Sequence, residues 1–238
     1  MSLSLLRNHI KTVATVYNHI LQSDGVGLNH KDTGDHGSGL LSEIRQSQET
    51  FQSSVVELGE DRNPITVKCH QPQGRWASIY YISFHEETRS TGPQTGYYPA
   101  FLMSLDQKTC WLSFMLSTGP FGVDSRYSLS PSKRDQIIAA AKIASDCLTE
   151  EDDWIKGPIY LGKDQTYLHT SPGGKFTFGR AYECASIIAK QFNPNEPPID
   201  IVQLLETAFQ YSDQIYNIEN QTAPIGHAFG NESNARAS

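Results

Sequence analysis

Four short segments rich in β-branched and aromatic residues lie in the middle of this chain, and they restrict the possible folds more than any other feature. Polar turns bound each segment, which is typical of strands. We expect a meander built from Ile65–His70, Arg75–Phe84, Tyr97–Met103 and Cys110–Leu116. Proline lacks a backbone N–H, so Pro99 is expected at a sheet edge or at a bulge.

Helical patterns lie on both sides of these strands. Apolar residues recur every three or four positions from Leu5 to Leu21 and predict an amphipathic first helix. A glycine-rich loop (23–39) and a second helix (about 40–54) are expected to follow it. Ser130 and Pro131 are a good helix start, because serine caps and proline suits the first position. Short strands are predicted at 159–161 and 167–169, and helices at 178–192 and 199–217.

This order of elements predicts an α+β fold, in which a curved, mostly antiparallel sheet is flanked by helices in a single domain. We expect that domain to cover residues 1–218, with a helical N-terminal part (1–60) followed by the sheet and closing helices (61–218). Residues 219–238 are rich in Asn, Ser, Gly and Ala, and we expect a linker or disordered tail there.

Composition restricts the class of protein. Mean hydropathy is −0.44, and no apolar run approaches the ~20 residues that span a bilayer. No signal peptide is recognisable, so a cytoplasmic location is expected. The four cysteines lie far apart, which favours free thiols over a zinc site or a disulfide framework. The net charge of −7 argues against non-specific nucleic-acid binding, but it leaves room for a reader with a local basic face.

Common catalytic motifs are missing from the sequence. There is no G-x-S-x-G elbow and no H-E-x-x-H zinc motif. The segment around Gly173-Gly174-Lys175 does not fit a phosphate-binding loop, because His169 stands where glycine is needed and Phe176 where Ser or Thr would hold magnesium. We therefore expect no catalytic residue, metal or cofactor in this chain.

Two enzyme-like patterns stay open as alternatives. Asp106 and Lys108 have the Asp-x-Lys spacing of metal-dependent nucleases, although a strand-to-strand turn is the simpler interpretation of this tripeptide. Imidazole and carboxylate groups in the glycine-rich loop have the chemistry to hold a metal, although that loop favours flexibility over a rigid shell. The residues concerned are His30, Asp32, Asp35 and His36.

Aromatic residues are concentrated in the predicted strands. Packing in a core with tyrosines at its rim is the simplest explanation. A functional explanation needs two rings that face each other across a gap one base thick, as in proteins that flip a base out of DNA. Base–aromatic stacking contributes about 1–3 kcal/mol, similar to the cost of unstacking, so such a pocket does not require a strongly basic protein. The residues are Trp76, Tyr80, Tyr81, Tyr97, Tyr98 and Trp111.

Two of these segments resemble a known signature. The run RWASIYYISF (75–84), a polar loop and the run QTGYYPAFL (94–102) look like the motif of the McrB-type N-terminal DNA-binding domain. The stretches 181–192 and 201–211 resemble the closing helices of that family, so the resemblance spans roughly 65–217. It implies a DNA-binding domain that recognises methylated or hydroxymethylated cytosine in duplex DNA by flipping the base into a pocket.

The resemblance also implies roles for individual residues. Tyr81 falls where the family has a stacking tryptophan, Tyr98 on the opposing tyrosine, and Leu102 on the apolar residue near the 5-substituent of the base. Gln73 falls where a side chain fills the gap in the duplex, while Gly74 and Arg75 would approach the backbone. The neighbouring aromatic residues Trp76 and Tyr97 complete the expected DNA-binding set.

The sequence departs from the family motif at two positions. Tyr80 replaces the proline of the motif and Tyr81 replaces its tryptophan. A tyrosine still stacks, but its face is smaller and it adds a hydroxyl group, so the preferred base is not fixed as 5-methylcytosine.

The leading hypothesis is therefore a binding module that gives specificity to a modification-dependent, type IV-like restriction enzyme. The family implies that a nuclease or an AAA-type translocase module acts with it, in the same chain or in a partner chain. The alternatives are a protein- or nucleotide-binding module of a defence complex, or a small nuclease that uses Asp106 and Lys108.

The sequence yields one direct prediction. Because Arg75 is expected to contact phosphate, Arg75→Ala should weaken binding to all duplexes alike and reduce the salt slope by about one. Titrations of labelled duplexes at several salt concentrations measure this. An effect confined to one base type would contradict the phosphate assignment.

Overall fold

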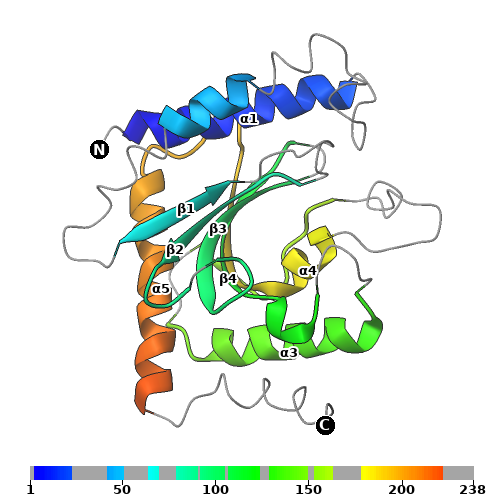
Figure 1. The fold of residues 1–238 in the computed structure, drawn as a ribbon, viewed down its shortest axis with the longest axis vertical. Helices are drawn as coiled ribbons and strands as arrows, with labels where there is room; N and C mark the ends of the chain where they lie inside the picture. Colours follow the sequence, from blue (N-terminus) through cyan, green and yellow to red (C-terminus); the bar gives the residue numbers. More distant parts are fainter. Residues whose placement is uncertain are drawn as a thin grey trace, which may run out of the picture.

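A six-stranded antiparallel sheet forms the centre of the fold in a computed structural model (Figure 1). The structure describes residues 3–22, 42–50, 64–69, 79–90, 92–104, 107–123, 129–149, 153–162 and 178–221. The strand order is β1-β2-β3-β4-β6-β5, and every neighbouring pair is antiparallel. The strands are β1 (Ile65–Cys69), β2 (Tyr81–Glu86), β3 (Tyr97–Met103), β4 (Cys110–Leu116), β5 (Ile155–Lys156) and β6 (Ser186–Phe192).

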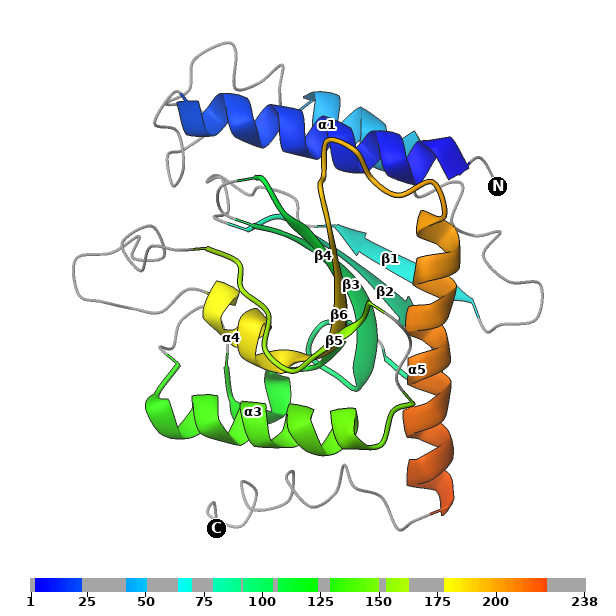
Figure 2. The same ribbon diagram turned by 180° about the vertical axis from the view of Figure 1, so that it is seen from behind.

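Helices cover both sides of this sheet (Figures 1 and 2). The long helices α1 (Leu3–Gln22) and α5 (Ile201–Gln221) pack on one face, which also carries Ile82. The short helix α4 (Phe178–Ala185) lies on the other face, and α3 (Pro131–Asp146) packs beside α4. The 3₁₀ turn η1 (Gly119–Phe121) follows β4. The architecture confirms the predicted α+β class with a mostly antiparallel sheet in one domain.

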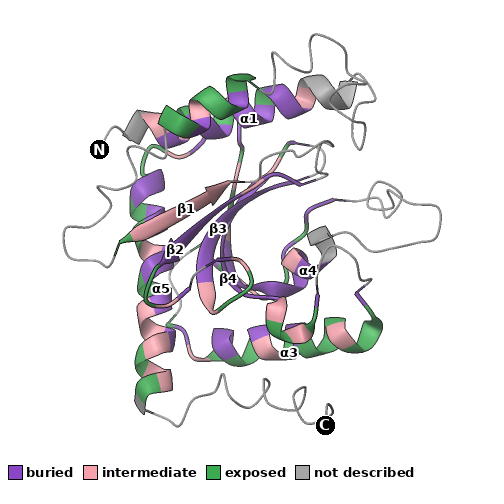
Figure 3. Cartoon of the chain, viewed as in Figure 1, coloured by how far each residue is buried: buried purple, intermediate pink, exposed green. Residues whose placement is uncertain are grey.

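The middle of the sheet is buried on both faces (Figure 3). Every residue of β4 is buried, and β3 is buried from its second residue onward. Phe101 of β3 contacts Phe84 and Phe192 edge to face, with ring centroids 5.8 and 6.0 Å apart. These three rings connect β2, β3 and β6 in the layer that faces α1 and α5.

Several sequence predictions are confirmed. The first helix, β1, β3 and β4 fall where the patterns placed them, and 42–50 is helical. The Ser130 hydroxyl accepts a hydrogen bond from the backbone N–H of Lys133 at 3.3 Å, and α3 begins at Pro131. Helix α5 ends at Gln221, three residues past the predicted domain limit at 218.

Pro99 lies in an interior strand, so the expected edge position is wrong. The pairing between β2 and β3 ends at Ala100, and Pro99 is the next residue beyond it. The missing N–H of proline therefore breaks no bond to β2. A register shift lies on the next strand, in the pairing of β4 with β6, between Phe114 and Met115; Phe114 is the partner of Pro99 in the pairing of β3 with β4.

Three predicted elements need correction. Residues 178–192 are not one helix, because α4 ends at Ala185 and β6 begins at Ser186. Ile187 and Ile188 are fully buried in a strand with neighbours on both sides, so alternation between apolar and polar residues is lost there. The second strand begins at Tyr81 instead of Arg75, and residues 75–78 lie outside the described part. The short strand after α3 is 155–156, whereas 159–161 is not a strand and 167–169 is not described.

The aromatic layer gives a stability prediction. Phe101→Ala should lower the free energy of unfolding by about 3–5 kcal/mol, because it leaves a cavity between two other rings. Urea denaturation measures the change. Ile199→Ala is the matched control, since this side chain is 77% exposed and its loss should cost less than about 0.5 kcal/mol. Equal effects of the two substitutions would contradict the assigned core.

Candidate nucleic-acid interface

The register between β2 and β3 gathers polar and aromatic side chains on the sheet face opposite α1 and α5. Tyr81 pairs with Leu102 and Ser83 pairs with Ala100. Side chains of paired residues point to the same side of a sheet, and every second side chain along a strand points to that side as well. His85 and Tyr98 therefore join this face, and their rings lie 4.8 Å apart. We call this surface the tyrosine face: Tyr81, Ser83, His85, Tyr98, Ala100 and Leu102, with Tyr182 of α4 above it.

Three tyrosines come together here, and we call them the tyrosine cluster: Tyr81, Tyr98 and Tyr182. The rings of Tyr81 and Tyr182 meet edge to face, with centroids 5.8 Å apart. Burial raises the pKa of all three hydroxyls, and the nearby tyrosine hydroxyls raise the pKa of Tyr98 and Tyr182 further. The cluster is therefore uncharged at neutral pH, and it offers ring faces and neutral hydroxyl groups.

Tyr98 is held at two points. Its hydroxyl donates to the backbone carbonyl of Pro93 at 3.4 Å, and its ring lies against the imidazole of His85 at an angle of 45°. The side chain is only 3% exposed. By contrast, Tyr81 and Tyr182 are half-buried. The cluster thus combines one fixed ring with two that are partly accessible.

The connection between β2 and β3 supports this arrangement from the side of α5. The Arg89 guanidinium pairs with Glu86 at 2.9 Å and with Asp213 of α5. The Tyr216 hydroxyl of α5 donates to the Arg89 carbonyl at 2.7 Å. Gly96 has φ +66°, and a Cβ at this position would lie 2.5 Å from that carbonyl oxygen. Only glycine satisfies both the turn and the close approach.

The predicted DNA-binding residues fall into two groups. Leu102 is buried on the tyrosine face, directly opposite Tyr81, so the structure brings Tyr81, Tyr98 and Leu102 together. Their role in binding stays a prediction. The other group lies outside the described residues and comprises Gln73, Gly74, Arg75 and Trp76. In the described part of the chain, β1 ends at Cys69 and β2 begins at Tyr81.

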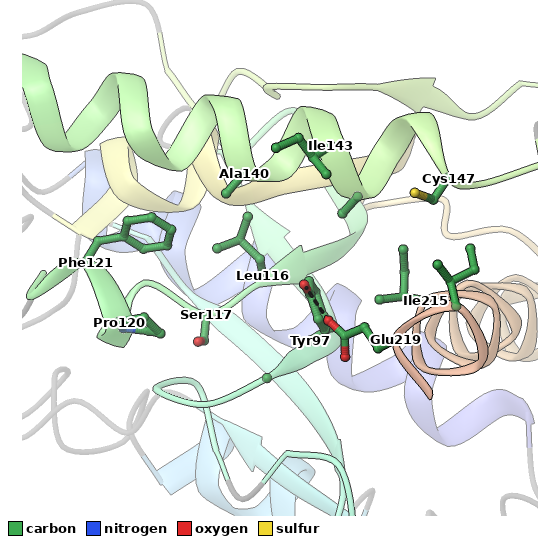
Figure 4. Close-up of a pocket in the computed structure, with 13 residues that line it drawn as sticks. Tyr97, Leu116, Ser117, Pro120, Phe121, Ala140, Ile143, Cys147, Ile215 and Glu219 are labelled. Atoms are coloured by element: carbon green, nitrogen blue, oxygen red, sulfur yellow. Dashed lines mark hydrogen bonds between the residues drawn. The ribbon is translucent and has the colours of Figure 1, made fainter. Parts of the chain in front are cut away.

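Tyr97 is separated from the cluster by the alternation of its strand. It points to the opposite face, where it lines a cavity of about 190 Å³ between α3, α5 and η1 (Figure 4). Its hydroxyl donates to Glu219 at 3.2 Å. Burial raises the pKa of Glu219, and this hydrogen bond opposes the rise. The structure therefore does not bring Tyr97 together with Tyr81 and Tyr98.

Two residues of the tyrosine face, Tyr182 and His85, were not predicted from the sequence. Tyr182 lies about a hundred residues after Tyr81, in a segment interpreted only as a closing helix. Its place above the sheet depends on the packing of α4, which no local pattern reveals. His85 is the other residue, and the alternation of β2 is a signal that could have placed it on the same face as Tyr81.

The enzyme-like patterns gain no support. Asp106 and the four residues of the glycine-rich loop lie outside the described part of the chain, and Lys108 is an exposed residue in the β3–β4 turn. Among the described residues, no group of three or more His, Cys, Asp or Glu side chains could hold a metal ion. The nuclease alternative stays untested.

The comparison with known families assigns this fold to a class of binding modules. The MrcB-like, N-terminal domain family matches residues 34–215, and the chain belongs to this family. Membership makes it a DNA-binding module of a restriction system, in agreement with the resemblance seen in the sequence. No curated protein sequence matches the chain. None of its described helices has both the length and the apolar character needed to cross a bilayer.

Two buried histidines give a prediction on pH. Burial lowers the pKa of both His9 and His85 from 6.5 to about 4, with a smaller contribution from Lys68 at His85. Both are neutral in the fold and protonate more readily when the chain unfolds. Stability should therefore fall as the pH drops from 6.5 toward 4, by at most about 1.4 kcal/mol per pH unit for each histidine.

Urea denaturation at several pH values measures this dependence. His9→Gln should flatten the curve by removing one of the two contributions, whatever its effect on stability at neutral pH. A free energy of unfolding that does not change over this range would show that the histidines are not held neutral.

Proposed function

We propose that this chain recognises a modified cytosine in duplex DNA and holds the flipped base against the tyrosine cluster. The observation that carries the proposal is the convergence of Tyr81, Tyr98 and Leu102 on one sheet face. A flipped base needs an aromatic face for stacking and an apolar neighbour for its 5-substituent. The same face provides both.

The electrostatics of the face suit a neutral ligand such as a base. The tyrosines are uncharged because burial raises each pKa, and the pKa of His85 is lowered to about 4. Stacking, worth about 1–3 kcal/mol per base, would supply the affinity at this point. Contacts to phosphate would come from other residues, with Arg75 as our candidate.

Entry of the base requires a movement within the cluster. Tyr98 is almost fully covered in the DNA-free chain, while Tyr81 and Tyr182 contact each other edge to face. We expect Tyr81 and Tyr182 to separate and the base to take a place between Tyr81 and Tyr98. The fixed Tyr98 ring then acts as the floor of the site and Tyr81 as its movable wall.

The hydroxyl of Tyr81 is expected to influence which modified base is preferred. The family motif has tryptophan at this position, whose indole N–H only donates a hydrogen bond, whereas a tyrosine hydroxyl both donates and accepts. A polar 5-substituent, such as a hydroxymethyl group, would find a partner there. We therefore expect 5-hydroxymethylcytosine to bind at least as tightly as 5-methylcytosine.

This module would supply specificity to a restriction enzyme. A nuclease or AAA-type module, in the same chain or a partner, would carry cleavage or nucleotide hydrolysis. Such a division of work agrees with the class of DNA-binding module to which the chain belongs.

Substitution of Tyr81 tests the proposal. Wild-type protein should bind a duplex with one modified cytosine more tightly than the same duplex with cytosine. Tyr81→Ala should remove most of this preference, about tenfold or more, because a stacking face is lost. Tyr81→Trp should keep the preference for 5-methylcytosine. Fluorescence anisotropy with labelled duplexes measures each affinity.

Tyr97→Phe is the control, since this neighbour of Tyr98 points to the opposite face. It should leave the preference unchanged. If the wild-type protein binds plain and modified duplexes equally, a modified base is not the ligand. If Tyr81→Ala keeps the full preference, the reading site lies elsewhere.

A further inference from the structure

His85 is the least expected member of the tyrosine face. It is a histidine in the middle of a sheet and only 1% exposed, yet both of its ring nitrogens have partners. Nδ1 lies 2.9 Å from the Ser90 hydroxyl oxygen, and Nε2 lies 2.8 Å from that of Ser83. Its ring contacts Tyr98. No motif in the sequence assigns it a role.

The serine contacts fix which nitrogen carries the proton. The Ser90 hydroxyl donates to the carbonyl of Thr95 at 2.7 Å, with that of Gly92 at 3.2 Å as an alternative acceptor. A hydroxyl has one proton, and the Thr95 carbonyl is the nearest acceptor for that of Ser90, so we assign Ser90 as the acceptor from His85 and place the proton on Nδ1. Nε2 is then free to accept the proton of Ser83, whose other acceptor, the Lys68 carbonyl, is farther away at 3.3 Å.

This chain of hydrogen bonds reaches the segment that holds Tyr98. Ser90, Gly92 and Thr95 belong to the β2–β3 connection. The carbonyl that accepts from the Tyr98 hydroxyl belongs to Pro93, in the same connection. His85 thus contacts the Tyr98 ring directly and also fixes the backbone that holds its hydroxyl.

We propose that His85 is a positioning residue of the base-reading site, which holds the ring of Tyr98 in the orientation needed to stack on a flipped base. This inference rests on the proposed function. A stacking surface that is already in place costs no ordering on binding, so a loose Tyr98 would weaken recognition of the base. Contacts to phosphate would be unaffected, because they do not involve this ring.

The burial of His85 supports a positioning role rather than direct contact with DNA. An exposed histidine would exchange between protonation states near neutral pH, and its hydrogen bonds would change with them. Here burial and the charge of Lys68 keep the pKa at about 4. The neutral form, with hydrogen on Nδ1, is therefore constant under ordinary conditions, and so is the support for Tyr98.

The test compares two buried histidines. His85→Leu keeps an apolar side chain under Tyr98 but removes both hydrogen bonds. It should lower the ratio of affinities for modified and plain duplex by about tenfold, while affinity for the plain duplex changes less than about twofold. His85→Gln, which retains a donor and an acceptor, should recover part of the ratio.

His9→Leu is the matched control. His9 is also buried and its pKa is also lowered to about 4, and its two nitrogens contact the hydroxyls of Ser47 and Tyr80, but it lies on α1 at the other side of the sheet. It should lower stability without changing the ratio. If both histidine substitutions change the ratio alike, His85 acts only through stability and the proposal is overturned.

A further variant keeps the proposal testable if His85→Leu does not fold. Ser90→Ala removes the acceptor of the Nδ1 proton at the start of the loop, and it should lower the ratio about threefold. A wild-type ratio in folded Ser90→Ala protein would overturn the positioning role while Tyr81→Ala still loses the preference. A wild-type protein without any preference would overturn the proposed function instead, and the role of His85 with it.

Discussion

The antiparallel register between β2 and β3 is the constraint on which the rest of the molecule depends. Side chains alternate along each strand, so one register assigns Ile82 and Phe84 to the core beneath α1 and α5. The same register assigns Tyr81 and His85 to the opposite face. A slip of β2 by one residue would turn Tyr81 and His85 toward α1 and α5, and Ile82 and Phe84 toward the opposite face. The pairing of β2 with β3 thus determines both the core and the candidate site. Because packing of the core stabilises this register, it also stabilises the geometry of the site.

On the proposed function, the tyrosine face would let an acidic protein bind DNA. With a net charge of −7, broad attraction to phosphate is weak, and affinity must come from a local site. Rings and neutral hydroxyls depend little on salt, because no counterion is released when they contact a base. On the proposed function, such a module would discriminate between bases more than it attracts DNA in general, which would suit a component that must ignore most of a genome.

The sequence predicted the parts of the fold in which local patterns are complete. β1, β3 and β4 lie between recognisable turns, and the Ser130-Pro131 pair marks a helix start that α3 follows. β6 was mistaken for helix because a strand buried on both faces shows no alternation. Strand alternation also separates the adjacent residues Tyr97 and Tyr98. Adjacent residues of a strand point to opposite faces, so only one of these two tyrosines can join the cluster. The place of Tyr182 depends on tertiary packing and could not be predicted locally.

Gly96 has a consequence for anyone who exchanges segments between relatives of this domain. Its missing side chain makes room for the Arg89 carbonyl and the Tyr216 hydroxyl, so one turn, one arginine and one residue of α5 form an interlocking set. Grafting the β2–β3 connection of another protein onto this sheet, in order to change the target base, would separate these partners. The transplant should succeed only when the matching positions of the C-terminal helix travel with it, although they lie more than a hundred residues away in the sequence.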